Sequence, residues 1–181
     1  MQPRRIMVYG VTGSGKSTLA ARISEVTGIP WTSVDDIGWL PGWGSRPQGE
    51  QRALIEAIVG QDEWILDSAY GAWLDLPMSR VEVIIALDYP RLTSLTRLIR
   101  RTARRLITRE EVCNGNVEGW REIFSRDSIL VWHFRSFKRK RTRIRQWAMD
   151  PDGPPVVHLR SPRATERWLE SLAAATGAGT S

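Results

Sequence analysis

The most constraining feature of the sequence is a glycine-rich segment of eight residues, Gly10-Val11-Thr12-Gly13-Ser14-Gly15-Lys16-Ser17. An apolar run at residues 6–9 precedes it, and a helix-forming run that opens with Thr18 follows it. Glycines at these positions let backbone N–H groups and a helix N-terminus approach a phosphate closely. The lysine reaches the β- and γ-phosphates, and the adjacent hydroxyl ligates magnesium. The segment therefore predicts a nucleotide-binding loop between a strand and a helix.

The expected contacts to ATP come from Gly10, Thr12, Gly13, Ser14, Gly15, Lys16, Ser17 and Thr18. A loop of this kind also needs a carboxylate at the end of a neighbouring strand to complete the magnesium shell. Asp67 closes the apolar run 64–67, and Asp88 follows the run 83–87. The sequence therefore predicts Ser17 and Asp67 as magnesium ligands, with Asp88 as the second candidate.

Short apolar runs alternate with amphipathic stretches along the chain, a pattern that predicts parallel strands joined by helices. The expected strands are residues 5–9, 31–34, 64–67, 81–87 and 155–159. The expected helices are residues 16–27, 48–60, 91–107, about 127–148 and 162–174. We expect one domain over residues 1–181, an α/β fold with a five-stranded parallel sheet in a three-layer sandwich.

Composition narrows the setting in which the chain works. Cys113 is the only cysteine, so no internal disulfide or four-cysteine zinc site can form, and a reducing cytoplasm fits best. No run approaches the 18 apolar residues of a membrane span, so we expect no membrane insertion. The net charge is +6, and residues 91–145 hold 16 basic against 5 acidic residues. Nucleotide phosphates and nucleic acid would both suit such a segment. The oligomeric state stays open.

Several segments, taken in order, resemble the adenylate-kinase-like P-loop kinases, and among them the topology modulation (FlaR-like) proteins. The matching segments are residues 13–20, 27–30, 35–43, 64–67 and 88–91, and the resemblance covers about residues 6–147. It implies an acceptor-binding segment at about residues 35–62, a helical lid at about residues 97–126, and the use of ATP and Mg²⁺. The sequence departs from the pattern at Ser68-Ala69-Tyr70, where Gly-Asn-Tyr is more usual.

The resemblance also implies roles for residues outside the loop. Asp35 would orient the phosphoryl acceptor, although an Asp-Asp turn or helix cap is the alternative. Trp39 and Trp43 would cover the acceptor, or simply pack beneath a loop. Arg97 and Arg101 would act from the lid to neutralise the transferring phosphoryl group, or form a solvated face.

Helical spacing divides the segment that starts at Arg91 into two stripes. One stripe is basic, with Arg97, Arg101 and Arg104. The other is apolar, with Leu92, Leu95, Ile99, Ala103 and Leu106.

A second basic run, residues 138–145, allows three interpretations. Arg139 and Arg143 could return to the nucleotide after the lid, the run could bind nucleic acid, or it could be a solvated helix face. His133 and His158 fit no metal or triad pattern, and we expect structural roles for them.

These observations favour a magnesium-dependent kinase that transfers a phosphoryl group from ATP to a small acceptor, a nucleotide or nucleoside being one class. The alternative is a nucleic-acid-binding protein switched by ATP, which the link of the resembling family to DNA topology encourages. We prefer the kinase because the arginines cluster where a lid belongs and no recognised nucleic-acid fold is present.

Overall fold

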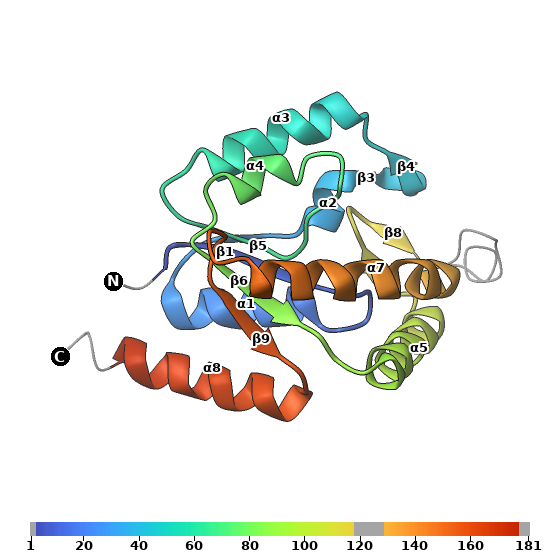
Figure 1. Ribbon diagram of the computed structural model, residues 1–181. Coiled ribbons are helices and arrows are strands. Elements are labelled where there is room, and N and C mark those ends of the chain that lie inside the picture. The colour runs from blue at the N-terminus through green and yellow to red at the C-terminus, as the bar shows by residue number, and fades with distance from the viewer. Residues whose placement is uncertain (1–2, 118–128, 178–181) are drawn as a thin grey trace.

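A computed structural model describes residues 3–117 and 129–177 of the chain. Its centre is a parallel sheet of five strands in the order β2-β5-β1-β6-β9 (Figure 1). The strands are β1 (Arg5–Gly10), β2 (Trp31–Thr32), β5 (Trp64–Leu66), β6 (Val83–Leu87) and β9 (Val156–Leu159). The strand before the glycine-rich loop is therefore the middle one, and the expected five-stranded parallel sheet is confirmed.

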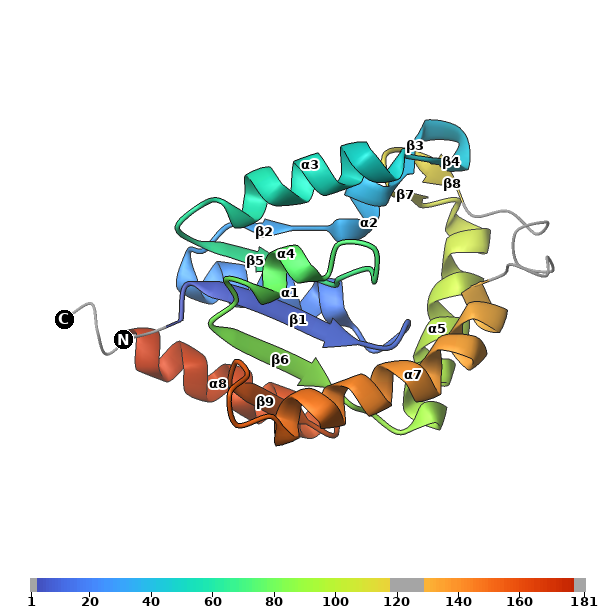
Figure 2. The same ribbon diagram turned by 45° about the horizontal axis from the view of Figure 1, so that its top comes forward.

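Helices cover both faces of this sheet, as strands buried on both sides require. One face carries α1 (Lys16–Thr27) and α8 (Pro162–Gly177), which pack on Ile6 and Val8 of β1. The opposite face packs on Met7 and Tyr9 and carries α3 (Gln48–Val59), α4 (Asp75–Met78) and α7 (Ile129–Met149) (Figures 1 and 2). The three-layer sandwich is confirmed. None of the described helices is long and apolar enough to cross a membrane.

The strand expected at residues 31–34 is shorter, because a small helix begins where it was to continue. The Ser33 hydroxyl accepts the Asp36 N–H at 3.4 Å and caps α2 (Val34–Gly38). Carboxylates in a first helical turn are favoured by the helix dipole. Asp35 and Asp36 therefore lie in the first turn of α2, and the strand ends at Thr32 and not at residue 34 as predicted.

Two small hairpins extend the region beyond the sheet. The first follows α2 and consists of β3 (Trp39–Leu40), the turn η1 (Pro41–Trp43) and β4 (Gly44–Ser45). The second, β7 (Glu111–Val112) with β8 (Asn116–Val117), follows α5 (Arg91–Thr108). α5 and this hairpin occupy the expected lid, whose residues 118–126 lie outside the described residues, as do residues 127–128 of the expected long helix.

Helix α5 does not bury its apolar stripe, and this differs from what its periodicity suggests. Its buried residues are Ser94, Leu98 and Thr102, whereas Leu92 is 72% and Ile99 48% exposed. The inner face of α5 combines Leu98 with the small polar residues Ser94 and Thr102, and it packs against the backbone of the glycine-rich loop. A β-carbon at Gly13 would lie 2.4 Å from the Ser94 carbonyl oxygen and 2.8 Å from Leu98 Cβ.

This close approach predicts a specific loss of stability for Gly13→Ala. Gly28 is the matched control, because its φ of 75° resembles the 81° of Gly13, yet a β-carbon there meets nothing within 4 Å. Gly28→Ala should lower the free energy of unfolding by about 1–2 kcal/mol, the cost of a left-handed conformation. Gly13→Ala should add about 1–3 kcal/mol more, because α5 must move away from the loop. Urea denaturation of both variants measures the difference, and equal losses would contradict the packing described.

Candidate active site

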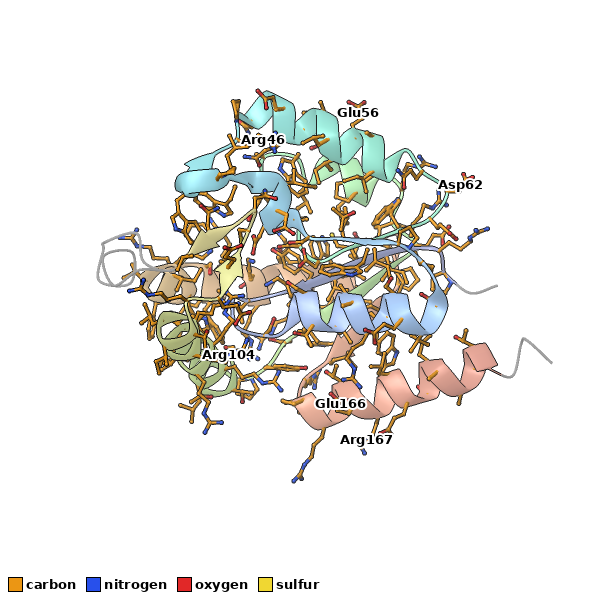
Figure 3. The ribbon with its side chains drawn as sticks, turned by 180° about the vertical axis from the view of Figure 1, so that it is seen from behind. Arg46, Glu56, Asp62, Arg104, Glu166 and Arg167 are labelled. Carbon is orange, nitrogen blue, oxygen red and sulfur yellow. The ribbon has the colours of Figure 1, made fainter. Side chains whose placement is uncertain are left out.

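A cleft of about 1700 Å³ opens beyond the carboxyl ends of the central strands, where ligands bind in open α/β sheets. Residues of the glycine-rich loop, α2, the two hairpins, α5, α7 and the start of α8 line it. Figure 2 shows α5 and α7 running along one side of this region, with the two hairpins next to each other at its edge. Arg46, at the cleft border between β4 and α3, is labelled in Figure 3.

The glycine-rich loop presents the start of α1 to the cleft. Every residue from Thr12 to Thr18 lines the cleft, and no side chain caps α1, so its first N–H groups are suited to an anion. The Ser14 hydroxyl donates to the Val11 carbonyl oxygen at 2.8 Å and holds the loop in shape. Gly10 lies behind the loop, where a β-carbon would come within 2.8 Å of the Ser14 hydroxyl oxygen. These predicted nucleotide contacts therefore form one contiguous surface, with Gly10 supporting it.

Lys16 extends along the loop with its charge close to two carboxylates. Its Nζ donates to the Val11 carbonyl oxygen at 3.2 Å. Burial lowers the pKa of Lys16, while the negative charges of Asp35 and Asp67 raise it. The ammonium group is thus held next to an acidic pair, in the position from which a lysine reaches nucleotide phosphates.

Asp67 lies directly after β5 and is 3% exposed. Its Oδ1 accepts the Val34 N–H at 2.8 Å, and a hydrogen bond from Ser17 lowers its pKa, although burial raises it more strongly. One carboxylate next to one hydroxyl fits Mg²⁺, which takes most of its remaining ligands from nucleotide phosphates and water. Within the described residues no group of three or more His, Cys, Asp or Glu side chains could hold a metal.

Asp88, the second candidate for magnesium, has different partners. Arg141 of α7 forms an ion pair with its Oδ1, and the Nε2 of His158 lies 2.9 Å from its Oδ2. Asp88 is 4% exposed, and its carboxylate joins α7 to β6 and β9. This arrangement gives Asp88 a structural place and gives His158 the structural role expected for it.

Asp35 lines the same cleft as the glycine-rich loop, and its carboxylate accepts a hydrogen bond from Tyr70. The Tyr70 hydroxyl donates to Asp35 Oδ1 at 2.5 Å, and both residues line the cleft. Burial, together with the charge of Asp35, raises the pKa of Tyr70, so this hydroxyl stays protonated and donating. Tyr70 belongs to the segment Ser68-Ala69-Tyr70, whose first two residues differ from the Gly-Asn-Tyr pattern of the resembling family. The tyrosine itself matches that pattern, and here it positions Asp35.

Three arginines of α5, spaced four residues apart, line the cleft: Arg97, Arg101 and Arg105. Arg97 donates to the Ser14 carbonyl oxygen at 3.3 Å, and the charge of Arg101 lowers the pKa of Lys16. Arg104, expected on this stripe and labelled in Figure 3, instead pairs with Glu110 at 2.8 Å. Arg105 was not predicted, although its spacing from Arg101 places it one turn further along the same face.

Two asparagines join the β7–β8 hairpin to the segment after α2. Asn114 Nδ2 donates to the carbonyl oxygens of Asp36 and Trp39, both at 2.7 Å. Asn116 Oδ1 accepts the Trp43 N–H at 2.7 Å. The rings of Trp39 and Trp43 meet edge to face at 5.8 Å and line the cleft. The β7–β8 hairpin therefore rests on the segment predicted to bind the acceptor, and no local pattern in the sequence indicates this contact.

Helix α7 brings the second basic run to the loop, through residues other than those predicted. Lys140 lines the cleft and donates to the Gly10 carbonyl oxygen at 3.2 Å. Arg143 lies against Tyr9, whose pKa it lowers against the stronger effect of burial, and Arg139 stacks on Trp132. His133 is buried and bonds the Thr12 carbonyl oxygen at 3.0 Å. Sequence periodicity does not reveal which residue of the run faces a loop distant in sequence.

No protein-family model matches this chain, and no curated protein is significantly similar to it. Its fold is similar to that of a gluconokinase from Sinorhizobium meliloti, with 18% identity over 99% of this chain and 98% of that chain and a TM-score of 0.54. A sugar kinase from Janibacter sp. gives 20% identity over 97% and 98% of the two chains and a TM-score of 0.52. A shikimate kinase from Acinetobacter baumannii in complex with shikimate gives 12% identity, 96% and 93% coverage, and a TM-score of 0.58. The chain therefore has the three-layer α/β fold of these kinases over nearly its full length.

Proposed function

We propose that the chain is a kinase that transfers the γ-phosphoryl group of ATP, with Mg²⁺, to a hydroxyl group of a small acceptor. The observation that carries the proposal is the place of Asp35, which lines the same cleft as Lys16 of the phosphate loop and as Arg97 and Arg101 of α5. A carboxylate beside the terminal phosphate is suited to an acceptor hydroxyl. The names of the similar structures, a gluconokinase and a shikimate kinase, also denote enzymes that act on small molecules.

The loop and the start of α1 would bind the phosphates of ATP through backbone N–H groups. Lys16 would exchange its contact with the Val11 carbonyl oxygen for the β- and γ-phosphates. Ser17 and Asp67 would hold Mg²⁺, which when bound neutralises phosphate charge and aligns the β- and γ-oxygens. Burial of Asp67 and its hydrogen bonds fix the carboxylate before the nucleotide arrives.

The acceptor would lie between Asp35 and the two tryptophans, Trp39 and Trp43. Its hydroxyl oxygen forms a bond to the γ-phosphorus as the bond to the β,γ-bridging oxygen breaks, and ADP leaves. The hydroxyl proton passes to Asp35, whose Oδ1 is held by the Tyr70 hydroxyl. The tyrosine thereby orients the carboxylate and leaves its second oxygen for the acceptor.

Arg97 and Arg101 would neutralise the charge that spreads over the transferring phosphoryl group. Both lie on the cleft side of α5, whose backbone contacts the loop at Gly13, so their placement is linked to the phosphate site itself. In this mechanism the protein forms no covalent bond to the phosphoryl group and takes up only the hydroxyl proton, at Asp35. The rate enhancement comes from positioning the two substrates and from neutralising the phosphoryl charge.

Nucleotides and nucleosides remain one predicted class of acceptor, and membership of the topology modulation (FlaR-like) group remains a prediction. The rival function, nucleic-acid binding through residues 138–145, has less support. Within that run Lys140 bonds the loop, Arg141 pairs with Asp88, and Arg143 contacts Tyr9, so these charges face the protein.

A screen of nucleosides, nucleotides, sugar acids and small polyols with Mg–ATP should identify an acceptor that stimulates ADP formation. Lys16→Ala should lower that activity at least about 100-fold, because the lysine contacts the phosphates and is not part of the core. Circular dichroism and thermal unfolding of the variant check that the fold is retained. Turnover by a clean, folded Lys16→Ala preparation at the wild-type rate would overturn the proposal.

The lid arginines yield a second kinetic prediction, with Arg100 as a control because it neighbours Arg101 but is exposed and does not line the cleft. Arg101→Ala should lower kcat by on the order of 100-fold, equal to about 2.7 kcal/mol, because the charge acts mainly in the transition state. Its KM for ATP should change by less than about threefold, since the ground-state phosphates keep the loop contacts. Arg100→Ala should keep the wild-type kcat. A large rise in KM with unchanged kcat would instead assign Arg101 to nucleotide binding.

A further inference from the structure

Two lysine ammonium groups rest on consecutive carbonyl oxygens of the glycine-rich loop. Lys16 Nζ lies 3.2 Å from the Val11 oxygen, and Lys140 Nζ lies 3.2 Å from the Gly10 oxygen. Both side chains line the cleft. Lys16 follows the loop directly, whereas Lys140 comes from α7, on the far side of the lid in sequence. The loop thus contacts a second cation, which comes from outside the glycine-rich segment.

The position of Lys140 is fixed by the packing of α7. One turn later Ile144 is fully buried in the core beneath α7, and one turn earlier Phe137 is 5% exposed. The next residue, Arg141, is paired with the buried Asp88. The Lys140 ammonium also lies 5.5 Å from the centre of the Tyr9 ring. These buried and paired neighbours on α7 fix the orientation of the helix, and this orientation directs the Lys140 side chain to the loop.

The charges around Lys140 place it near the terminal phosphate end of the site. Burial lowers its pKa to about 7, and the neighbouring charge of Lys16 is the next largest cause. Arg139 and Arg143 of α7 also lower this pKa, and Asp35 raises it. Lys16 and Asp35 are the groups expected at the γ-phosphate and at the acceptor, so Lys140 faces the same point from α7.

We propose that Lys140 is a second phosphate-binding lysine of the nucleotide site. When ATP binds, the Lys140 ammonium group exchanges its contact with the Gly10 carbonyl oxygen for a contact with the terminal phosphate. The inference rests on the nucleotide site of the proposed function and extends it to a residue beyond the loop. Burial and the charge of Lys16 disfavour the ammonium form of Lys140 more than the charge of Asp35 favours it, and a bound phosphate would offset both effects. Lys140 thereby favours ATP over ADP, which lacks the terminal phosphate.

This role has a proton-linked consequence. In the free protein a pKa of about 7 leaves Lys140 mainly neutral at pH 8. A bound phosphate raises that pKa, so the protein takes up a proton with ATP above pH 7 and takes up little below it, where the lysine is already charged. At pH 8 the terminal phosphate is itself fully ionised, because its pKa is about 6. The proton taken up therefore belongs to the protein.

Calorimetric titration at pH 8 with magnesium and a non-hydrolysable ATP analogue, in two buffers of different ionisation enthalpy, tests the proposal. Lys140→Met should weaken analogue binding at least about tenfold, as expected for the loss of one charge-assisted hydrogen bond, and should reduce the proton uptake. Binding of ADP should weaken by less than about threefold, since its phosphates keep the loop contacts. The control is Lys138→Met, an exposed lysine of the same helix, which should bind both nucleotides like the wild type.

The outcomes separate this inference from the proposed function. If the wild-type protein binds neither nucleotide, the proposed function fails. Suppose that the wild-type protein binds both nucleotides. If Lys140→Met then binds both as tightly as the wild type, or if its affinity for both falls by the same factor, Lys140 has no terminal-phosphate role and the inference is overturned. If Lys140→Met does not fold, Lys140→Arg decides. A preference for the ATP analogue with less proton uptake than the wild type supports the proposal, because arginine is always charged, and undiminished proton uptake overturns it.

Discussion

Helix α5 can lie against the glycine-rich loop because Gly13 has no side chain to hold it away. The same contact explains why α5 buries Ser94 and Thr102, whereas Leu92 is exposed. A bulky apolar inner face would need more space than a glycine backbone leaves. With α5 held there, Arg97, Arg101 and Arg105, spaced four residues apart, line the cleft, so the geometry of the glycine-rich loop and the position of these arginines have one cause.

The part of the cleft around the glycine-rich loop is rich in positive charge, which suits an anionic ligand. Lys16, Lys140, Arg97, Arg101 and Arg105 line the cleft, and burial lowers the pKa values of Lys16 and Lys140. Six carboxylates also line it, and two of them, Asp35 and Asp67, act on the charge of Lys16. The contact between the β7–β8 hairpin and the acceptor segment, in contrast, uses neutral asparagine amides, so it does not compete for the charge of a nucleotide.

The parts that could be predicted from the sequence are those with local signals. Strand and helix periods located the sheet and the main helices, and glycine, lysine and serine at fixed spacing located the loop. Helix α2 was missed because its cap, Ser33, lies within an apparently continuous strand. The buried face of α5 was missed because it packs on backbone, which leaves no apolar pattern. Lys140 and Asn116 were missed because their partners, Gly10 and Trp43, are distant in sequence.

Two carboxylates that are almost equivalent in the sequence show how tertiary partners divide such residues between folding and a site. Asp67 and Asp88 each follow a buried strand, and both are nearly inaccessible. Asp88 is engaged by Arg141 and His158, and this ion pair fixes α7 on the sheet. Asp67 has a backbone N–H and the Ser17 hydroxyl as its partners, which leaves its charge beside the phosphate loop. The ion pair with Asp88 fixes Arg141 and therefore α7, and the preceding residue, Lys140, is thereby held on the loop. Asp88 thus also shapes the site, although it does not enter it.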